Sequence, residues 1–239
     1  AGGLDVRTEG RPASGAYVDL TRQVLAVFAP DGRPRSARYV VPADDSAACF
    51  PIAGALVSRG RVELEGLDPG SAQPDAVFRR WAAEAGGALR WEGAGEEAVL
   101  AVEGAVRGGV EADVDPAPDA ALPLVALVAF AGGASRLRGV ARLREKESDR
   151  LAAAAELLTR VGATARVEEE PGEACLLVDG PAGRPARADF RASGDHRVAM
   201  AAAVLALALP EGSTLDDPGV VTKSYPGFWS DWSSLVTPL

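Results

Sequence analysis

The residue types most suited to chemistry in this sequence form one dense segment, Lys-Glu-Ser-Asp-Arg, which begins at Lys146. Lys146 and Arg150 could neutralise an anion, and Glu147 could transfer a proton. Ser148 or Asp149 could cap a helix that starts at this point. On its own, a segment of this kind is more often a solvated helix start with local salt bridges. Its chemistry therefore depends on what the rest of the chain brings to it.

A second charged segment, Gly-Asp-His-Arg, opens an almost wholly apolar run at 196–209. The N-terminus of a helix carries partial positive charge, so a basic side chain there is electrostatically unfavourable. We therefore expect Arg197 to have an anionic partner, and an ion pair with nearby Asp195 is the simplest alternative. His196 alone is more often a structural hydrogen-bonding residue than a catalyst.

Asp119 and Lys223 occupy two further polar turns. Asp119 directly precedes an apolar run at 120–130, where it could simply be an N-cap, and Lys223 is a lone lysine that would ordinarily be exposed. The free N–H groups at helix starts also suit phosphate and carboxylate ligands. No single one of these segments decides the function.

The elements that must position these side chains recur along the chain with a period of roughly 60 to 80 residues. Each copy opens with a polar turn, continues as an apolar helix that ends near a Gly or a polar break, and then forms a strand. The three helix and strand pairs are expected at 47–58 and 61–67, at 120–130 and 135–140, and at 196–209 and 213–215.

A second helix and two strands follow in the first two copies, and alternating apolar residues indicate the strands. These elements are expected at 73–85, 88–91 and 98–102, and at 148–161, 163–167 and 174–178. The third copy is shorter and ends in a helix at 225–235. The sequence therefore predicts an α/β (α+β) fold with three related units in one domain.

The predicted domain covers residues 43–239, with repeats at about 43–104, 105–180 and 181–239. Residues 1–42 lie outside the repeat pattern and are interpreted as the tail of a different domain, with a turn at Gly32 near the boundary. The chain opens on what reads as a strand already under way and carries no initiator Met. We therefore expect it to begin in the middle of a longer protein.

Composition excludes several classes of function. Of the 239 residues, 47% are hydrophobic and 25% are charged, which is typical of a globular protein. The formal charge of -9 would repel nucleic acids and anionic membranes, so an anionic ligand needs a local cluster of basic groups. The most apolar run, 120–134, contains Pro123 and is too short to span a bilayer.

Cysteine and histidine usage is equally restrictive. Two distant cysteines, Cys49 and Cys175, fit a reducing cytosol better than a disulfide scaffold, and a single histidine cannot build a histidine-rich metal site. We expect no secretion signal, because no basic segment followed by an apolar run opens the sequence. We predict a cytoplasmic monomer without metal or cofactor, which binds neither nucleic acid nor membrane.

Read together, the charged turns resemble motifs of the 5-enolpyruvylshikimate-3-phosphate synthase family, in the same order and with similar spacing. The related enzymes that act on UDP-N-acetylglucosamine share the fold, but these motifs look like the shikimate branch. The resemblance spans the chain through ASGAYVDLT at 13–21, VPADDSAACF at 41–50, PDAA at 118–121, KESDR at 146–150, DHRVAM at 195–200 and TKSYPGFW at 222–229.

The resemblance implies a fold of two similar domains, each built from three βαβαββ units, with the active site in the cleft between them. Residues 43–239 would form most of one domain, and residues 1–42 the end of the other. The N-terminal half of the family's chain would be missing. This chain is therefore expected to be inactive without that half, which would be its partner.

The family's reaction transfers the enolpyruvyl group of phosphoenolpyruvate to the 5-hydroxyl of shikimate 3-phosphate and releases phosphate. The resemblance implies that Asp119 contacts the shikimate hydroxyls and transfers protons. Glu147 would be the second acid–base group beside the enolpyruvyl carbons. Lys223 would hold the phosphate of phosphoenolpyruvate or assist proton transfer.

The remaining implied site residues bind substrate. Lys146 would contact shikimate 3-phosphate, while Arg150 and Arg197 would hold the carboxylate of phosphoenolpyruvate. Ser14 and Tyr17 would line the shikimate phosphate site from the other domain. All of these assignments follow from the resemblance alone.

Two departures from the family pattern, Arg142 and Glu145, keep an enolpyruvyl transferase with a different acceptor open as an alternative. A non-catalytic ligand-binding module of the same fold is a further alternative. The full set of acidic and basic motif residues is present, which argues against a module that has lost its catalytic function.

Overall fold

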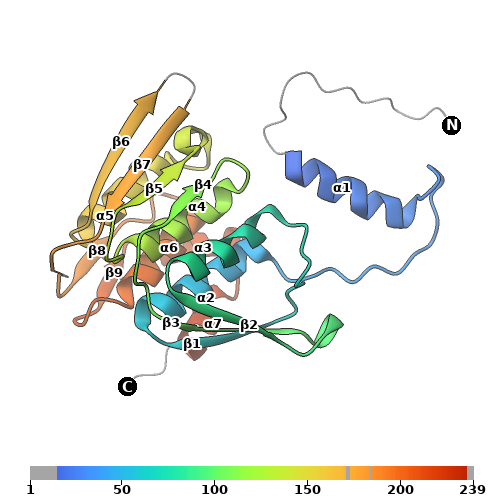
Figure 1. Ribbon diagram of the computed structural model, residues 1–239, viewed down its shortest axis with the longest axis horizontal. Helices are drawn as coiled ribbons and strands as arrows, with labels where there is room; N and C mark the ends of the chain where they lie inside the picture. Colours follow the sequence, from blue (N-terminus) through green and yellow to red (C-terminus); the bar gives the residue numbers. More distant parts are fainter. Residues whose placement is uncertain (1–14, 171–172, 184, 236–239) are drawn as a thin grey trace.

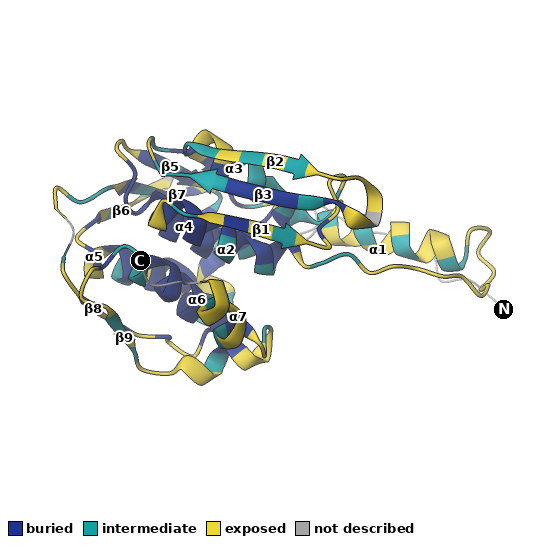
Figure 2. Cartoon of the chain, turned by 90° about the horizontal axis from the view of Figure 1, so that it is seen from below, coloured by how far each residue is buried: buried dark blue, intermediate teal, exposed yellow. Residues whose placement is uncertain are grey.

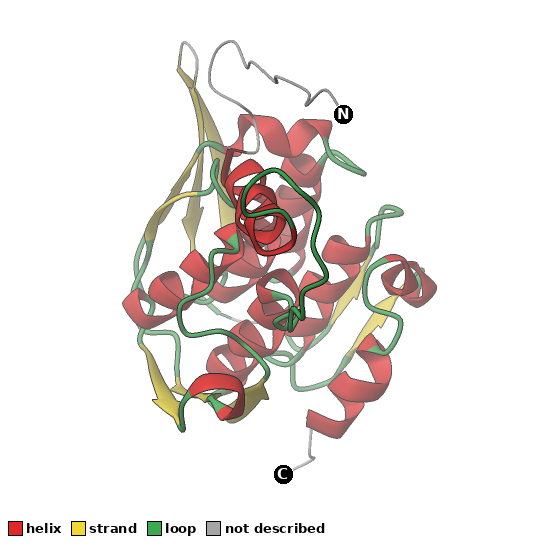
Figure 3. Cartoon of the chain, turned by 90° about the vertical axis from the view of Figure 1, so that its right-hand side faces the viewer, coloured by secondary structure: helices red, strands yellow, loops and turns green. Residues whose placement is uncertain are grey.

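The computed structural model describes residues 15–170, 173–183 and 185–235. Three small sheets surround a group of apolar helices, and one further helix, α1 (Gly15–Phe28), projects from this body (Figure 1). Seen from the side, the helices fill the centre of the body and the strands lie toward its margins (Figure 3). In the described residues, no helix is both long and apolar enough to cross a bilayer.

Three helices form the centre of the body: α2 (Asp45–Ser58), α4 (Ala121–Val128) and α6 (His196–Ala206). All eight residues of α4 are buried, and α2 and α6 are buried along most of their length (Figure 2). A helix that is apolar on every side must be covered on every side. The many alanines at these positions allow the three helices to pack against one another closely.

The first sheet packs on α2 and has the order β1-β3-β2, with antiparallel neighbours. Its register places Val102 opposite Val62 on one side and Leu89 on the other. The elements of this unit are β1 (Arg61–Glu65), η1 (Pro74–Val77), α3 (Phe78–Glu84), β2 (Gly87–Glu92), η2 (Gly95–Glu97) and β3 (Val99–Gly104).

The second sheet has the order β4-β5-β7-β6, in which only the β4–β5 pair is parallel. Two 3₁₀ turns in this unit, η3 and η4, precede helices and carry site residues or lead to them. The further elements are β4 (Glu111–Asp113), η3 (Pro118–Ala120), β5 (Ser135–Arg138), η4 (Val140–Glu145), α5 (Arg150–Arg160), β6 (Thr164–Glu170) and β7 (Glu173–Asp179).

The third sheet is a parallel pair, β8 (Ala188–Phe190) and β9 (Ser213–Leu215). The chain then passes through η5 (Pro218–Lys223) into α7 (Phe228–Leu235). Phe228 anchors α7 because its buried ring stacks on Trp232 and meets the edge of Phe50 from α2.

The expected helices and strands of the three repeats are present, with shifted ends. The helix expected at 73–85 is divided, because Pro74 opens a 3₁₀ turn and the α-helix begins only at Phe78. The helix expected from Tyr225 begins at Phe228, since the preceding Pro-Gly pair interrupts it. The sequence did not predict α1, β4 or β8. The strand expected near the start of the chain lies outside the described residues.

Candidate functional site

Arg150 is the central residue of a buried charged cluster. Its side chain is only 1% exposed, and its guanidinium donates to carboxylates from three separate segments. Nη1 donates to Asp119 at 2.7 Å, Nη2 to Glu147 at 2.7 Å, and Nε to Asp195 at 2.8 Å. A further contact of 3.4 Å joins Nη2 to Asp195. Burial lowers the pKa of Arg150, but Asp195 and Asp119 outweigh burial and raise it, so the group stays charged.

Three more basic side chains reach the same carboxylates. Arg197 lies 3.2 Å from Asp119 through Nη2, and its Nη1 donates to the Asp119 carbonyl at 3.3 Å. Lys146 lies 3.6 Å from Asp119, and Lys223 donates to Glu147 at 3.1 Å. We call this set the charged cluster: Asp119, Lys146, Glu147, Arg150, Asp195, Arg197 and Lys223.

The sequence expectation that Arg197 needs an anionic partner is met by Asp119 rather than by neighbouring Asp195. Asp195 instead caps α6, because its carboxylate accepts from the Arg197 backbone N–H at 2.9 Å. Asp119 is not an N-cap of α4, since it lies inside η3 and turns its carboxylate to the basic side chains. Asp149 is the residue that caps α5, by accepting from the Ala152 N–H.

Helix starts bring the charged cluster together. Asp119 lies in η3, the turn that leads into α4, Arg150 is the first residue of α5, and Arg197 is the second residue of α6. The free N–H groups at these starts add positive potential, which favours negative charge in the site. The three carboxylates of Asp119, Glu147 and Asp195 offset most of the charge of the four basic side chains and leave a net positive charge.

Asp195 was not among the site residues expected from the sequence. It is fully buried, and it also accepts from the Ser148 hydroxyl at 3.1 Å. Burial raises the pKa of Asp195, but Arg150 and the hydrogen bonds outweigh burial and lower it. The sequence signal for this role was weak, because Asp195 also fits the ordinary pattern of an N-cap.

Both candidate acid–base groups are held in their ionised forms. Burial raises the pKa of Asp119, but Arg197, Lys146 and Arg150 together lower it below its ordinary value. Burial also raises the pKa of Glu147, whereas its own backbone N–H, Lys223 and Arg150 lower it. At neutral pH both groups are therefore proton acceptors until a ligand changes their surroundings.

Tyr17 lies on α1 and reaches the body through its hydroxyl, which donates to Asp75 at 2.8 Å and also interacts with Ser46. It does not contact the charged cluster directly. Burial and Asp75 raise the pKa of Tyr17, and Asp119 raises it further. Ser14, the other residue expected from this segment, lies outside the described residues.

His196 is 4% exposed and lies beside the charged cluster at the start of α6. Its Nδ1 finds no hydrogen-bond partner within the part of the chain that the structure describes, and it lies 3.8 Å from Asp195. Burial and Arg197 lower the pKa of His196, so it is neutral at neutral pH. In the described part of the chain, no three His, Cys, Asp or Glu side chains are arranged to hold a metal ion.

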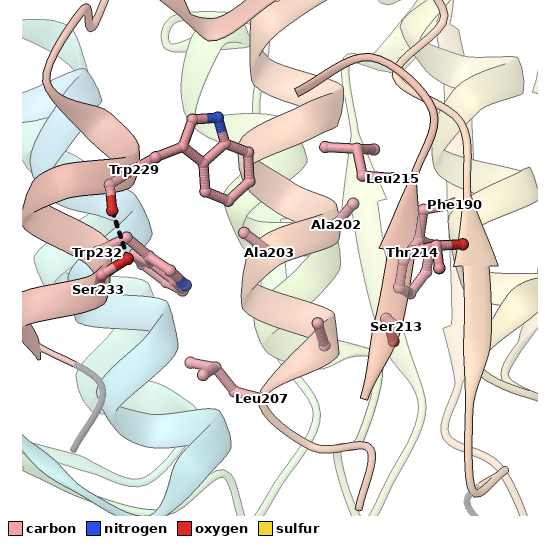
Figure 4. A pocket seen from close by; sticks show the side chains of 11 residues that line it. Phe190, Ala202, Ala203, Leu207, Ser213, Thr214, Leu215, Trp229, Trp232 and Ser233 are labelled. Carbon is pink, nitrogen blue, oxygen red and sulfur yellow. Dashed lines mark hydrogen bonds between the residues drawn. The ribbon is translucent and has the colours of Figure 1, made fainter. Parts of the chain in front are cut away.

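A pocket of about 500 Å³ lies away from the charged cluster, between α6, β9 and α7. Figure 4 shows Trp229 and Trp232 on one side of it, with Ala203 of α6 between them and the strand residue Thr214. No charged side chain lines this pocket. The charged cluster is therefore the better candidate for an anionic substrate.

Solved structures with the same architecture include an EPSP synthase from Acinetobacter baumannii, with a TM-score of 0.69 and 24% identity over 85% of this chain and 48% of that chain. The enolpyruvyl transferase NikO from Streptomyces tendae gives a TM-score of 0.60 and 22% identity, over 82% of this chain and 44% of that chain. This chain therefore has the enolpyruvyl transferase fold, and the fold predicted from its sequence is confirmed.

The family model for EPSP synthase (3-phosphoshikimate 1-carboxyvinyltransferase) matches residues 13–232. The 3-phosphoshikimate 1-carboxyvinyltransferase of Aeropyrum pernix is 38% identical over 94% of this chain and 53% of its own length. The protein of the same name from Methanoculleus marisnigri is 38% identical over 95% of this chain and 54% of its own length. The chain belongs to the EPSP synthase family. It spans about half the length of the curated relatives it matches.

Proposed function

We propose that this chain supplies one wall of an active site that transfers the enolpyruvyl group of phosphoenolpyruvate to the 5-hydroxyl of shikimate 3-phosphate. The transfer releases phosphate and belongs to the shikimate pathway of chorismate and aromatic amino-acid biosynthesis. The observation that carries the proposal is the charged cluster, in which two proton-transfer carboxylates lie among four basic side chains. The curated relatives from Aeropyrum pernix and Methanoculleus marisnigri are named for this activity.

The cluster suits two anionic substrates because its basic groups can change partners. Arg197 and Lys223 now pair with Asp119 and Glu147, respectively. A substrate carboxylate or phosphate would draw these cations to itself, since charge-assisted hydrogen bonds to such groups are strong. Asp119 and Glu147 would then lose part of the stabilisation of their ionised forms, and their pKa values would rise toward the range useful for proton transfer.

The chemistry requires two proton movements. In the first step the 5-hydroxyl oxygen bonds to C2 of phosphoenolpyruvate, its proton passes to a base, and a second proton is added to the methylene carbon. In the second step the new methyl group loses a proton, the C2–O bond to phosphate breaks, and the double bond returns. Asp119 serves the hydroxyl, Glu147 serves the carbon, and the basic side chains hold the phosphate that leaves.

Lys146 and Arg150 complete the wall in different ways. Lys146 is 25% exposed and can reach a substrate phosphate, whereas Arg150 is nearly closed off and donates four of its N–H bonds within the cluster. Arg150 therefore reaches the phosphoenolpyruvate carboxylate only as Glu147 or Asp119 moves aside. Ser14 and Tyr17 complete the shikimate phosphate site from their own segment.

The structure gives less support to the alternative of an enolpyruvyl transferase with a different acceptor. Arg142 contacts Asp115 at 3.1 Å, outside the charged cluster, and Glu145 is exposed. Neither departure from the family pattern therefore alters a residue of the cluster. The cytoplasmic location and the monomeric state stay predictions, as does the division of the chain at residue 42.

A chimera tests the proposed function directly. The upstream half of the Aeropyrum pernix relative is joined to this chain, and phosphate release from phosphoenolpyruvate and shikimate 3-phosphate is measured. We expect turnover by the chimera, and a loss of about 10²- to 10⁴-fold in kcat on Glu147→Gln, with substrate binding largely kept. Glu145→Gln removes the same charge two residues away and should change kcat less than about twofold.

Two results would count against the proposal. Unchanged turnover in Glu147→Gln would rule out an acid–base role for that residue. A chimera that unfolds cooperatively but binds neither substrate would contradict the enolpyruvyl transfer itself. Direct binding is measured by calorimetry, so that loss of chemistry and loss of affinity are separated.

A further inference from the structure

A buried carboxylate outside the charged cluster connects α1 to the body. Asp75, on η1, is 1% exposed, and its Oδ2 accepts from the Tyr17 hydroxyl at 2.8 Å and from the Ser46 hydroxyl at 2.9 Å. Among the described residues, its Oδ1 has no hydrogen-bond partner. A buried carboxylate is costly unless donors satisfy it, so the two hydroxyls are important to its stability.

Little else holds α1 in place. The helix has 14 residues, none of them buried. A helix of this length is only marginally stable in water by itself. Within the described residues, every hydrogen bond or ion pair that joins 15–42 to the rest of the chain involves the Tyr17 hydroxyl, which donates to Asp75 and also interacts with Ser46. The helical state of α1 therefore depends strongly on the Tyr17 hydroxyl.

Asp75 also lies close to the proposed active site. η1 packs against η3, which carries Asp119. The fields of Asp119 and Arg197 both reach the Asp75 carboxylate, and the field of Asp119 also reaches the Tyr17 hydroxyl. A contact at this place can set the position of α1 relative to the charged cluster.

We infer that Asp75 is a positioning residue, which seats α1 on the body by accepting from Tyr17 and so fixes the tyrosine beside the charged cluster. The seating of α1 is a property of this chain alone. Its consequence for substrate binding rests on the proposed function. Two measurements test the seating of α1 and its effect on substrate binding separately.

The first measurement is amide hydrogen exchange of peptides that cover 18–28, in the chain as it exists. Tyr17→Phe removes only the donor, from a residue that is 36% exposed, so it leaves the core intact. We expect exchange in α1 to speed up by at least about tenfold in Tyr17→Phe and in Asp75→Ala, the effect of losing a hydrogen bond to a charged group. Asp75→Asn keeps an acceptor oxygen and should restore part of the protection.

The double variant and a matched control make this test specific. Adding Asp75→Ala to Tyr17→Phe should give no further change in α1, because both variants remove the same contact. Asp45 is an equally buried carboxylate, but its partner is Arg79. Asp45→Asn should therefore weaken the body without selectively exposing α1. Wild-type protection of α1 in Tyr17→Phe, no protection of α1 in the unaltered chain, or fully additive effects would overturn the inference.

The second measurement uses the active chimera. Asp75→Ala and Tyr17→Phe should each raise KM for shikimate 3-phosphate several-fold while kcat falls less, since both variants act on substrate positioning. A fall in kcat at unchanged KM would contradict the positioning role. If the unaltered chimera is inactive, the proposed function fails, and the exchange result still decides how α1 is seated.

Discussion

At the scale of single residues, Arg150 links carboxylates that lie far apart in the sequence. Asp119 precedes it by 31 residues, and Asp195 follows it by 45. Once such an ion cluster is buried, removing one partner leaves the others without compensation, and this costs more than the cluster contributes as a whole. Arg150 is therefore as important for the fold of the site as for any ligand.

We expect Arg150→Met to lower the free energy of unfolding by about 3–5 kcal/mol, because three carboxylates lose their shared cation. Arg160→Met, on the same helix, removes a half-exposed partner of Glu156 and should change the free energy of unfolding by less than about 0.5 kcal/mol. Urea denaturation monitored by circular dichroism measures both. Similar losses in the two variants would contradict the central role of Arg150.

The single histidine gives the chain a pH response that can be assigned to one residue. Burial lowers the pKa of His196, so the unfolded state binds its proton more readily than the folded state below about pH 6.5. Stability should therefore fall as pH drops below about 6.5, by up to about 1.4 kcal/mol per pH unit until the lowered folded pKa is reached.

His196→Gln should remove this part of the pH dependence. The measured quantity is the difference in free energy of unfolding between wild type and variant from pH 7.5 to 5, so that Asp75 and other titrating groups contribute equally to both. A difference that stays constant over this range would show that His196 has the same pKa in both states.

The sequence predicted the members of the charged cluster better than their contacts. Electrostatics at a helix start required an anion for Arg197, but Asp119 lies 78 residues away and no spacing rule identifies it. Asp195 was missed because its cap position explains it locally. The pairing of Tyr17 with Asp75 was equally hidden, since it depends on how α1 meets the body.

At the scale of elements, the turn before η4 aligns the segment that carries Lys146 and Glu147. Gly139 begins this turn at φ +73°, and a Cβ at this position would lie 2.7 Å from Asp113 Oδ1 and 2.8 Å from the Asp115 N. Both the backbone conformation and the space therefore require glycine.

Gly139→Ala should destabilise the protein by about 1–3 kcal/mol more than Gly212→Ala, because only the first adds steric overlap to the cost of a left-handed alanine. Gly212 has φ +75° with no atom within 4 Å of the added Cβ, so it isolates the backbone cost. Thermal unfolding of the two variants provides the comparison. Equal losses of stability in the two variants would show that the loop at Asp115 moves to make room for the added methyl group at no cost in free energy.

Apolar runs that follow polar turns were sufficient to predict α2, α4 and α6, because burial on all sides leaves a continuous signal. The strands β4 and β8 have three residues each, too few for alternation to be visible. In α1 the half-buried residues follow a spacing of four, but exposed Val18 and Leu25 blur that pattern.

At the scale of the whole molecule, the chain presents one wall of the proposed site and spans about half the length of its curated relatives. Closure of two domains around substrate completes a site of this kind and excludes water. We therefore expect no measurable phosphate release by this chain alone under conditions in which the chimera turns over. Robust release by the isolated chain would show that one wall is sufficient.

The contacts of Arg150 have a consequence for how a buried positive charge is kept stable in this wall. Asp119, Glu147 and Asp195 are counter-ions supplied by the chain itself, so the buried guanidinium is always paired with negative charge. Under the proposed function, a substrate anion takes the place of part of this internal negative charge. Substrate binding then redistributes charge that is already present, and a carboxylate that loses its basic partner becomes easier to protonate.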